Sequence, residues 1–171
     1  MSAVIDARAR AKVQAVAEET IQGEYLQALR LIERLHRLLL DVIKDEFQRQ
    51  GGSDLNSVQA LLIYNIGESE LTAGDLKRGG YYLGSNVSYN LKKLVDMGYI
   101  HYKKSETDGR SVRVSLTDKG HDVCDVVNKL YQRQLNSIET VGSVDNEDLK
   151  HLNKALMRLE RFWSHQILYR L

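Results

Sequence analysis

Apolar residues recur every three or four positions along most of the chain, a pattern that predicts amphipathic helices. The clearest stretch covers residues 24–50 and is closed by Gly51 and Gly52. A shorter stretch covers residues 53–67 and ends at Gly67. Its N-cap can be Asp54, Asn56 or Ser57, and its inward side chains should be Val58, Leu61, Leu62 and Ile66.

The middle of the chain predicts a short helix, a second helix and a β-hairpin. The short helix should begin at Thr72 and end at Gly79, and the second should cover residues 85–97 with Ser85 as its N-cap. The period then becomes two on either side of Asp108-Gly109, which is the sequence signal of a hairpin turn. The inward side chains should be Val87, Leu91, Leu94 and Val95 on the helix and Val112, Val114 and Leu116 on the hairpin, with Arg113 and Ser115 on the hairpin's other face.

Two further helices are predicted after the hairpin. Thr117 should cap the first, whose apolar residues continue towards Gly142, and Ser143 or Asp145 should cap the last. Residues 3–20 are helix-prone because they are rich in alanine and charge, but their apolar stripe is thin. The last helix alternates spacings of three and four, as in a coiled-coil seam, at Leu149, Leu152, Leu156, Leu159, Trp163 and Ile167. We therefore expect the two ends of the chain to pair with those of a second copy across a twofold axis.

A short helix, a glycine turn, a second helix with a polar outer face and a hairpin together predict a winged helix-turn-helix. The fold should be mainly α with a small β-hairpin wing and long terminal dimerisation helices. We expect one domain over residues 1–171, with a helical dimerisation part at 1–50 and 119–171 and a winged DNA-binding part at 53–118. The exposed helix would fit the major groove of B-DNA, and an arginine at the wing tip would suit the minor groove.

The candidate DNA contacts lie on the outer face of the second helix and on the hairpin. Short hydrogen-bonding side chains open the helix and can meet base edges, and the lysines that follow can meet phosphates. The set is Ser85, Asn86, Ser88, Tyr89, Lys92, Lys93, Lys104 and Arg110. In the preceding turn we expect Tyr82 to pack in the core, while Tyr81 can face either the core or the DNA backbone.

The run DGRSVRVSLTDKG at residues 108–120, after LKKLVDMGYI at residues 91–100, resembles the MarR family of bacterial transcription regulators. The resemblance covers the wing and the second helix closely and the flanking helices only in pattern. It implies a homodimer on a near-palindromic operator, released by a small-molecule effector or an oxidant. It also implies an effector pocket where the dimerisation helices meet the winged part, near His36, Leu39, Ile43, Leu62 and Ile66.

The turn before the second helix, GGYYLG at residues 79–84, departs from the family's pattern and leaves open which of Ser85 and Asn86 meets a base. The sequence GYYLGSNVSYNLKKLV at residues 80–95 also resembles that of a subgroup of regulators that control L,D-transpeptidase cell-wall genes in alphaproteobacteria. The targets would then be cell-wall or stress genes. Whether they are repressed or activated stays open.

Net charge is uninformative for this chain, but the placement of charge is not. The 171 residues carry a formal charge of only +1, and 43% are apolar, enough to bury a core. Residues 71–113 hold eight cations and four anions, a local surplus of four. No apolar run is long enough for a membrane span, the start is charged where a signal peptide is apolar, and there is a single cysteine, so we expect a cytoplasmic protein without membrane contact.

Other chemistry is weakly supported by the sequence. Cys124 can be a redox sensor, but its neighbours Val123, Asp125 and Val126 favour a small buried side chain. His121 and Cys124 lie three residues apart, yet two ligands make no metal site, and we expect neither metal nor other cofactor. No catalytic constellation indicates an enzyme. The alternative to a DNA-binding regulator is a winged helix that serves as a protein-interaction module.

Overall fold

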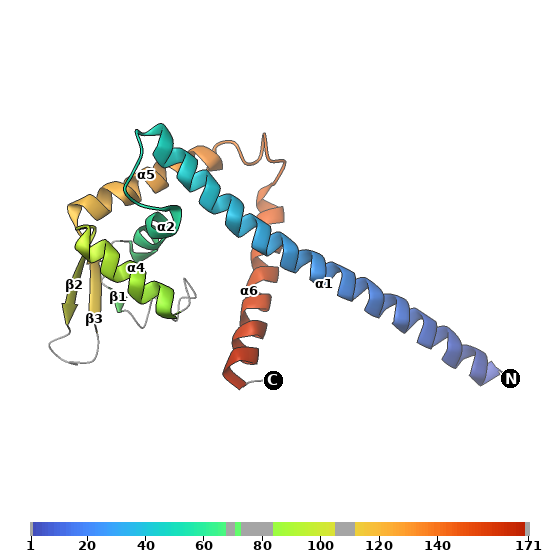
Figure 1. The fold of residues 1–171 in the computed structure, drawn as a ribbon. Coiled ribbons are helices and arrows are strands. Elements are labelled where there is room, and N and C mark those ends of the chain that lie inside the picture. Colours follow the sequence, from blue (N-terminus) through green and yellow to red (C-terminus); the bar gives the residue numbers. More distant parts are fainter. Residues whose placement is uncertain (1, 68–70, 73–83, 105–111, 170–171) are drawn as a thin grey trace.

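The computed structural model describes residues 2–67, 71–72, 84–104 and 112–169, with side chains described from residue 20 onward except at 72, 84–87, 104 and 112 (Figure 1). The helices are α1 (Ser2–Arg49), α2 (Ser57–Ile66), α4 (Gly84–Asp96), α5 (Asp118–Leu135) and α6 (Asn146–Tyr169). The strands are β1 (Leu71–Thr72), β2 (Ile100–Lys104) and β3 (Val112–Leu116). The mainly α fold with a β-hairpin is confirmed.

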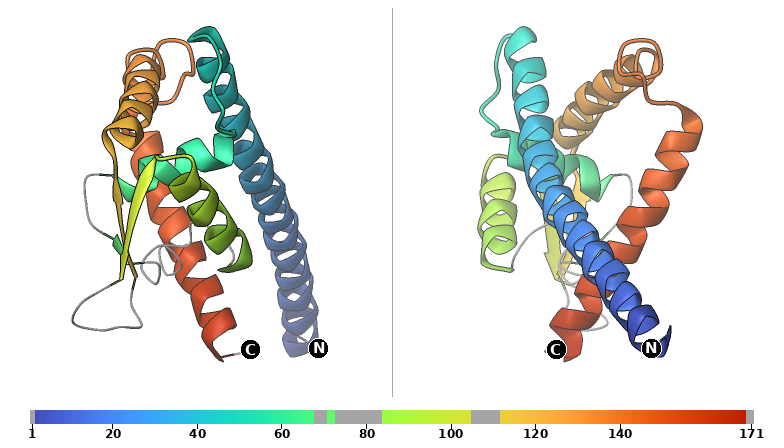
Figure 2. Two further views of the ribbon diagram at one scale, coloured as in Figure 1. Left: turned by 60° about the vertical axis from the view of Figure 1, so that its left-hand side comes forward. Right: turned by 90° about the vertical axis from the view of Figure 1, so that its right-hand side faces the viewer.

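The winged part packs against the C-terminal half of α1, and the N-terminal half of α1 projects away from the rest of the chain (Figures 1 and 2). Helix α6 crosses α1 near the middle of α1 (Figures 1 and 2). The Trp163 indole N–H donates a hydrogen bond to the Tyr25 hydroxyl at 3.2 Å, which joins the two helices. No helix in the described ranges is long and apolar enough to cross a membrane.

The sheet has three antiparallel strands in the order β1-β3-β2. Val114 of the central strand pairs with Leu71 on one side and with Tyr102 on the other. The hairpin strands are confirmed, and Val114 and Leu116 are buried as predicted. Leu71–Thr72 form a short strand that the sequence did not predict. The helix that Thr72 was predicted to cap, at 73–79, lies outside the described residues.

The core lies between the C-terminal part of α1, helices α2, α4 and α5, and one face of the sheet. Helix α2 is surrounded on several sides, so it buries Gln59, Ala60 and Ile63 as well as the predicted Leu62 and Ile66. The predicted inward residues Val58 and Leu61 are only partly buried. The larger buried side chains are Ile43, Leu62, Ile63, Ile66, Leu91, Leu94, Tyr99, Ile100, Val114, Leu116, Val123, Val127 and Leu130.

Local hydrogen bonds explain where the helices begin. Among the three candidate caps of α2, the structure selects Asn56, which accepts from the Gln59 amide at 2.9 Å and donates its own amide to the Gln59 side chain at 3.1 Å. Thr117 caps α5 as predicted and accepts from the Gly120 amide at 3.2 Å. Asp145 precedes α6 and accepts from the Asp148 amide at 2.8 Å.

Two helix lengths differ from the prediction. Helix α1 is continuous from Ser2 to Arg49, so the two stretches predicted at 3–20 and 24–50 are one element. Helix α5 ends at Leu135, before Gly142, and residues 136–142 form turns. The Ser137 hydroxyl donates to the carbonyls of Arg133 and Gln134 at this end of the helix.

Candidate nucleic-acid interface

Helix α4 presents a polar face to solvent and an apolar face to the core. Leu91 and Leu94 are buried, with 3% and 0% of their surface exposed. Ser88, Tyr89, Lys92 and Lys93 are exposed, and Tyr89 keeps 66% of its surface. A hydrogen bond of 3.3 Å from the buried Gln59 side chain of α2 to Asn90 helps to hold α4 in place. The helix is therefore amphipathic with its polar side outward, as predicted.

The structure describes only part of the predicted contact set. Ser88, Tyr89, Lys92 and Lys93 lie together on α4. Ser85 and Asn86 belong to the first turn of α4 and Lys104 to the end of β2, but their side chains are not among those described, and Arg110, Tyr81 and Tyr82 lie outside the described residues. The roles of all eight predicted contacts stay predictions.

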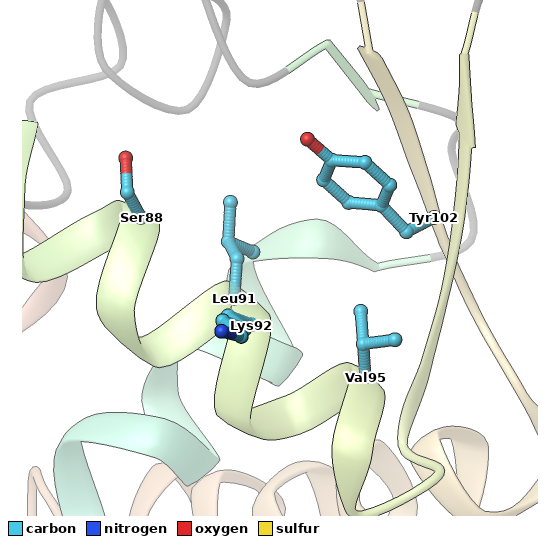
Figure 3. Close-up of a pocket in the computed structure, with 5 residues that line it drawn as sticks. All are labelled: Ser88, Leu91, Lys92, Val95 and Tyr102. Carbon is cyan, nitrogen blue, oxygen red and sulfur yellow. The ribbon is translucent and has the colours of Figure 1, made fainter.

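A hollow of about 330 Å³ lies between α4 and β2 (Figure 3). It is lined by Ser88, Leu91, Lys92, Val95 and Tyr102. Leu91 and Val95 form an apolar floor, while the hydroxyl of Tyr102 points from the strand towards the helix. Tyr102 was missing from the predicted set, although strand alternation places it on the same face as the buried Ile100 and so beside α4.

The opposite face of the hairpin is basic. His101, Lys103 and Arg113 are exposed, and Lys103 lies directly opposite Arg113 in the strand register. The sequence signal for this basic face is the alternation of side chains on either side of the turn.

A cluster of polar groups fixes the joint between α4 and the hairpin. The Tyr99 hydroxyl donates to Asp54, which follows α1, and the Lys119 ammonium lies 3.5 Å from the Asp54 carboxylate and 3.9 Å from the centre of the Tyr99 ring. The hydrogen bond from Tyr99 lowers the pKa of Asp54, and burial followed by that same bond raises the pKa of Tyr99. The Thr117 hydroxyl donates to the Gly98 carbonyl at 2.7 Å. These contacts position the hairpin beside α4.

A second polar link joins α1 to α5. The Glu46 carboxylate, 6% exposed as a residue, accepts hydrogen bonds from Gln50 at 2.9 Å and from Arg133 of α5. The bonds from Gln50 and Arg133 lower the pKa of Glu46. These contacts link α1, the expected dimerisation helix, to α5, the helix that follows the wing.

The residues predicted for an effector pocket are close in space but mostly packed. Ile43, Leu62 and Ile66 belong to the core, Leu39 packs against them, and His36 is exposed on α1. Ligand entry at this place would require α1 and α2 to separate. The pocket stays a prediction.

Cys124 is buried, and its thiol lies 3.6 Å from the Ile63 carbonyl, so the prediction of a small buried side chain is confirmed. A buried thiol in apolar surroundings is poorly reactive. In the described part of the chain, no three His, Cys, Asp or Glu side chains gather in a way that could hold a metal ion.

Comparison with known proteins identifies the part of the chain that contains α4 and the hairpin. A family profile described as a winged helix DNA-binding domain matches residues 55–120. The exopolysaccharide II synthesis transcriptional activator ExpG of Rhizobium meliloti (strain 1021) is 35% identical over 148 residues, which cover 85% of this chain and 74% of that protein. This relative is a transcriptional regulator, which agrees with the prediction that the chain is not an enzyme.

Solved structures share the fold at lower identity. The transcriptional regulator SlyA has a TM-score of 0.70 at 17% identity, covering 84% of this chain and 99% of that chain. AbsC, a MarR family regulator from Streptomyces coelicolor, has a TM-score of 0.63 at 21% identity, covering 82% and 95%. A MarR mutant from E. coli complexed with operator DNA has a TM-score of 0.64 at 20% identity, covering 80% and 95%. The likeness to the L,D-transpeptidase subgroup is not confirmed and stays a prediction.

Proposed function

This chain belongs to the winged-helix transcriptional regulators with a MarR-like fold, and on that premise we propose that it binds a pseudo-palindromic operator as a homodimer. One observation carries the proposal: α4 buries Leu91 and Leu94 and presents Ser88, Tyr89 and Lys92 to solvent beside a β-hairpin. An exposed helix of this kind fits the major groove, where its first turns meet base edges.

Within this proposal each part of the surface has its own role. Ser85, Asn86, Ser88 and Tyr89 meet base edges, and Lys92, Lys93 and Lys104 meet phosphates, while Arg110 enters the minor groove from the wing. Phosphate contacts fix the register on DNA, and base contacts supply the sequence preference. The basic outer face of the hairpin adds electrostatic attraction without sequence preference.

The homodimer is supported by apolar side chains on α1 and α6. Helix α6 has no buried residue in the single chain, although its sequence carries a continuous apolar seam. A groove of about 800 Å³ lies between the two helices and is lined by Ile32 of α1 and by Leu156, Leu159, Trp163 and Ile167 of α6, among others. Further exposed apolar residues are Leu31, Leu35, Leu38, Leu152 and Phe162. Apolar surface of this extent marks an association site, and a second copy offers the matching seam.

We propose that an effector acts by changing the distance between the two α4 helices. A twofold dimer would place them about 34 Å apart, one helical turn of DNA, and a shift of a few ångströms would lose register with one half-site. The proposed effector site near His36, Leu39 and the core residues Ile43, Leu62 and Ile66 opens only when α1 moves relative to α2. Binding to that opened arrangement would shift the population away from the DNA-binding form. Thermal stabilisation by a small molecule, together with operator release, tests this role.

A relative of this chain bears on whether transcription is activated or repressed. The relative from Rhizobium meliloti is described as an activator of exopolysaccharide II synthesis. We propose that this chain likewise activates transcription, with cell-surface genes among its targets. Transcription from a bound promoter, measured with and without the chain, should rise. A fall would make the chain a repressor and leave the DNA-binding proposal untouched.

The experiment that tests the proposed function is selection of genomic DNA fragments by the full chain. The recovered fragments should share two inverted half-sites with centres about one helical turn apart. The binding constant should fall steeply as salt concentration rises, because phosphate contacts release counterions. Retention of no fragment in dilute buffer would contradict the proposal and support the protein-interaction alternative.

A further inference from the structure

We propose that the hollow between α4 and β2 is the binding site for one phosphodiester group of the DNA backbone, and that Tyr102 is a DNA contact. This inference rests on the proposed function and goes beyond it by assigning a site and a residue. The hollow is lined by Ser88, Leu91, Lys92, Val95 and Tyr102 (Figure 3).

The position of the hollow suits a strand of the DNA backbone. When α4 occupies the major groove and the hairpin reaches the neighbouring minor groove, the strand that separates the two grooves must pass between them. The hollow lies at that place, with α4 on one side and β2 on the other. The backbone strand therefore crosses the mouth of the hollow.

The lining residues carry groups that suit a phosphate. Lys92 supplies a positive charge, and Tyr102 supplies a hydroxyl that can donate to a phosphate oxygen. Ser88 and Lys92 are one helical turn apart on α4, so they share a face of the helix. The floor of Leu91 and Val95 is apolar and suits the sugar carbons beside the phosphate rather than a second charge.

The two sides of the hollow are held in place by the fold. Tyr102 is half exposed at 50%, and its backbone is held in the sheet by pairing with Val114. The neighbouring joint is fixed by the hydrogen bond from Tyr99 to Asp54. The backbones of Lys92 on α4 and Tyr102 on β2 are thus held at a set separation, so the site selects the position of a phosphate rather than the identity of a base.

The test is a double-mutant cycle between protein and DNA. The probe is a duplex recovered by the full wild-type chain, remade as a series in which one phosphate of a half-site at a time is replaced by an uncharged methylphosphonate. The protein variants are Lys92→Gln and Tyr102→Phe. Matched controls on α6 are Lys154→Gln and Tyr169→Phe, which exchange the same groups at exposed positions away from the hollow.

We expect Lys92→Gln to weaken binding about 10-fold and Tyr102→Phe about 5-fold, as for loss of a charged and a neutral hydrogen bond. Both variants should become insensitive to the methylphosphonate at one and the same position, because the contact there is already lost. Both should weaken binding to unrelated duplexes by the same factors, since the site does not read bases. The two α6 variants should behave as wild type.

Two results would overturn the phosphate site while leaving the proposed function intact: coupling of Lys92 and Tyr102 to different phosphates, or coupling of Tyr102 to none. Failure of the wild-type chain to recover any duplex would instead remove the proposed function itself. Unchanged melting temperatures of the variants would show that the measured effects arise at the DNA surface.

Discussion

At the residue scale, Gly120 shows how closely α5 approaches the hairpin. A Cβ atom added there would lie 2.3 Å from the Tyr99 carbonyl oxygen and 3.2 Å from the Leu116 Cβ. The backbone of Tyr99 is part of the joint beside α4 and has little room to move, because the Thr117 amide donates to that same carbonyl at 3.1 Å. Glycine is therefore required at this position by space.

We predict that Gly120→Ala lowers the free energy of unfolding by about 1–3 kcal/mol, the usual cost of overpacking. The control is Gly23→Ala in α1, where an added Cβ has no neighbour within 4 Å and a gain of up to about 1 kcal/mol is expected from helix propensity. Urea unfolding followed by circular dichroism measures both. Equal stability of the two variants would contradict the close approach.

Glu46 gives a prediction that depends on pH. Its pKa is lowered from the ordinary value of 4.5 by the hydrogen bonds from Gln50 and Arg133, so the charged form stabilises the folded state. That contribution is fully present above pH 4.5 and is lost as the pH falls through the lowered pKa. Glu46→Gln should therefore be less stable than wild type at neutral pH, by about 1 kcal/mol after allowance for solvent screening.

The difference in the free energy of unfolding between wild type and Glu46→Gln should become smaller when unfolding is measured at successively lower pH. Glu33→Gln is the matched control, since Glu33 forms an exposed pair with Arg37 within α1. If this difference in the free energy of unfolding stayed constant between pH 7 and pH 3, the Glu46 carboxylate would not be ionised in its contact with α5.

At the scale of elements, the parts with a strong local signal could be predicted from the sequence, and those made by tertiary contact could not. Asp108-Gly109 between two alternating runs predicted the hairpin strands, and Thr117 marked the start of α5. A strand of two residues such as Leu71–Thr72 has no period to detect, and it forms because β3 lies beside it. Tyr102 was missed for a related reason, since only the packing of α4 against β2 creates the hollow that it lines.

The outer face of α4 supplies the prediction at this scale. The double variant Lys92→Gln, Lys93→Gln should reduce the slope of log K against log salt by about 1.8, because each phosphate contact contributes about 0.9. The matched control Lys129→Gln, Lys154→Gln removes the same charge from exposed positions on α5 and α6. Fluorescence anisotropy of a labelled duplex at several salt concentrations measures the slopes. Identical slopes for the two double variants would show that α4 lysines contribute only general charge.

At the scale of the whole molecule, α6 gives the main support for the proposed homodimer. Ile167 is 79% exposed, so a charge there costs an isolated chain little. In a dimer that buries this seam, Ile167→Glu should raise the dimer dissociation constant by about 100-fold or more, since an unpaired charge would be buried. The control Lys154→Glu lies on the polar side of α6. Sedimentation equilibrium measures the dimer dissociation constants. Equal dissociation constants for Ile167→Glu and Lys154→Glu would place the dimer contact elsewhere.

The central claim is that two chains, joined through α1 and α6, hold two α4 helices one turn of DNA apart. Its most direct test is the affinity of the full chain for a recovered operator and for the same operator with five base pairs inserted between its half-sites. The insertion turns one half-site to the opposite side of the duplex, so we predict that affinity falls to that of a single half-site and that the intact operator binds two chains. Unchanged affinity after the insertion, or one chain bound to the intact operator, would contradict the claim.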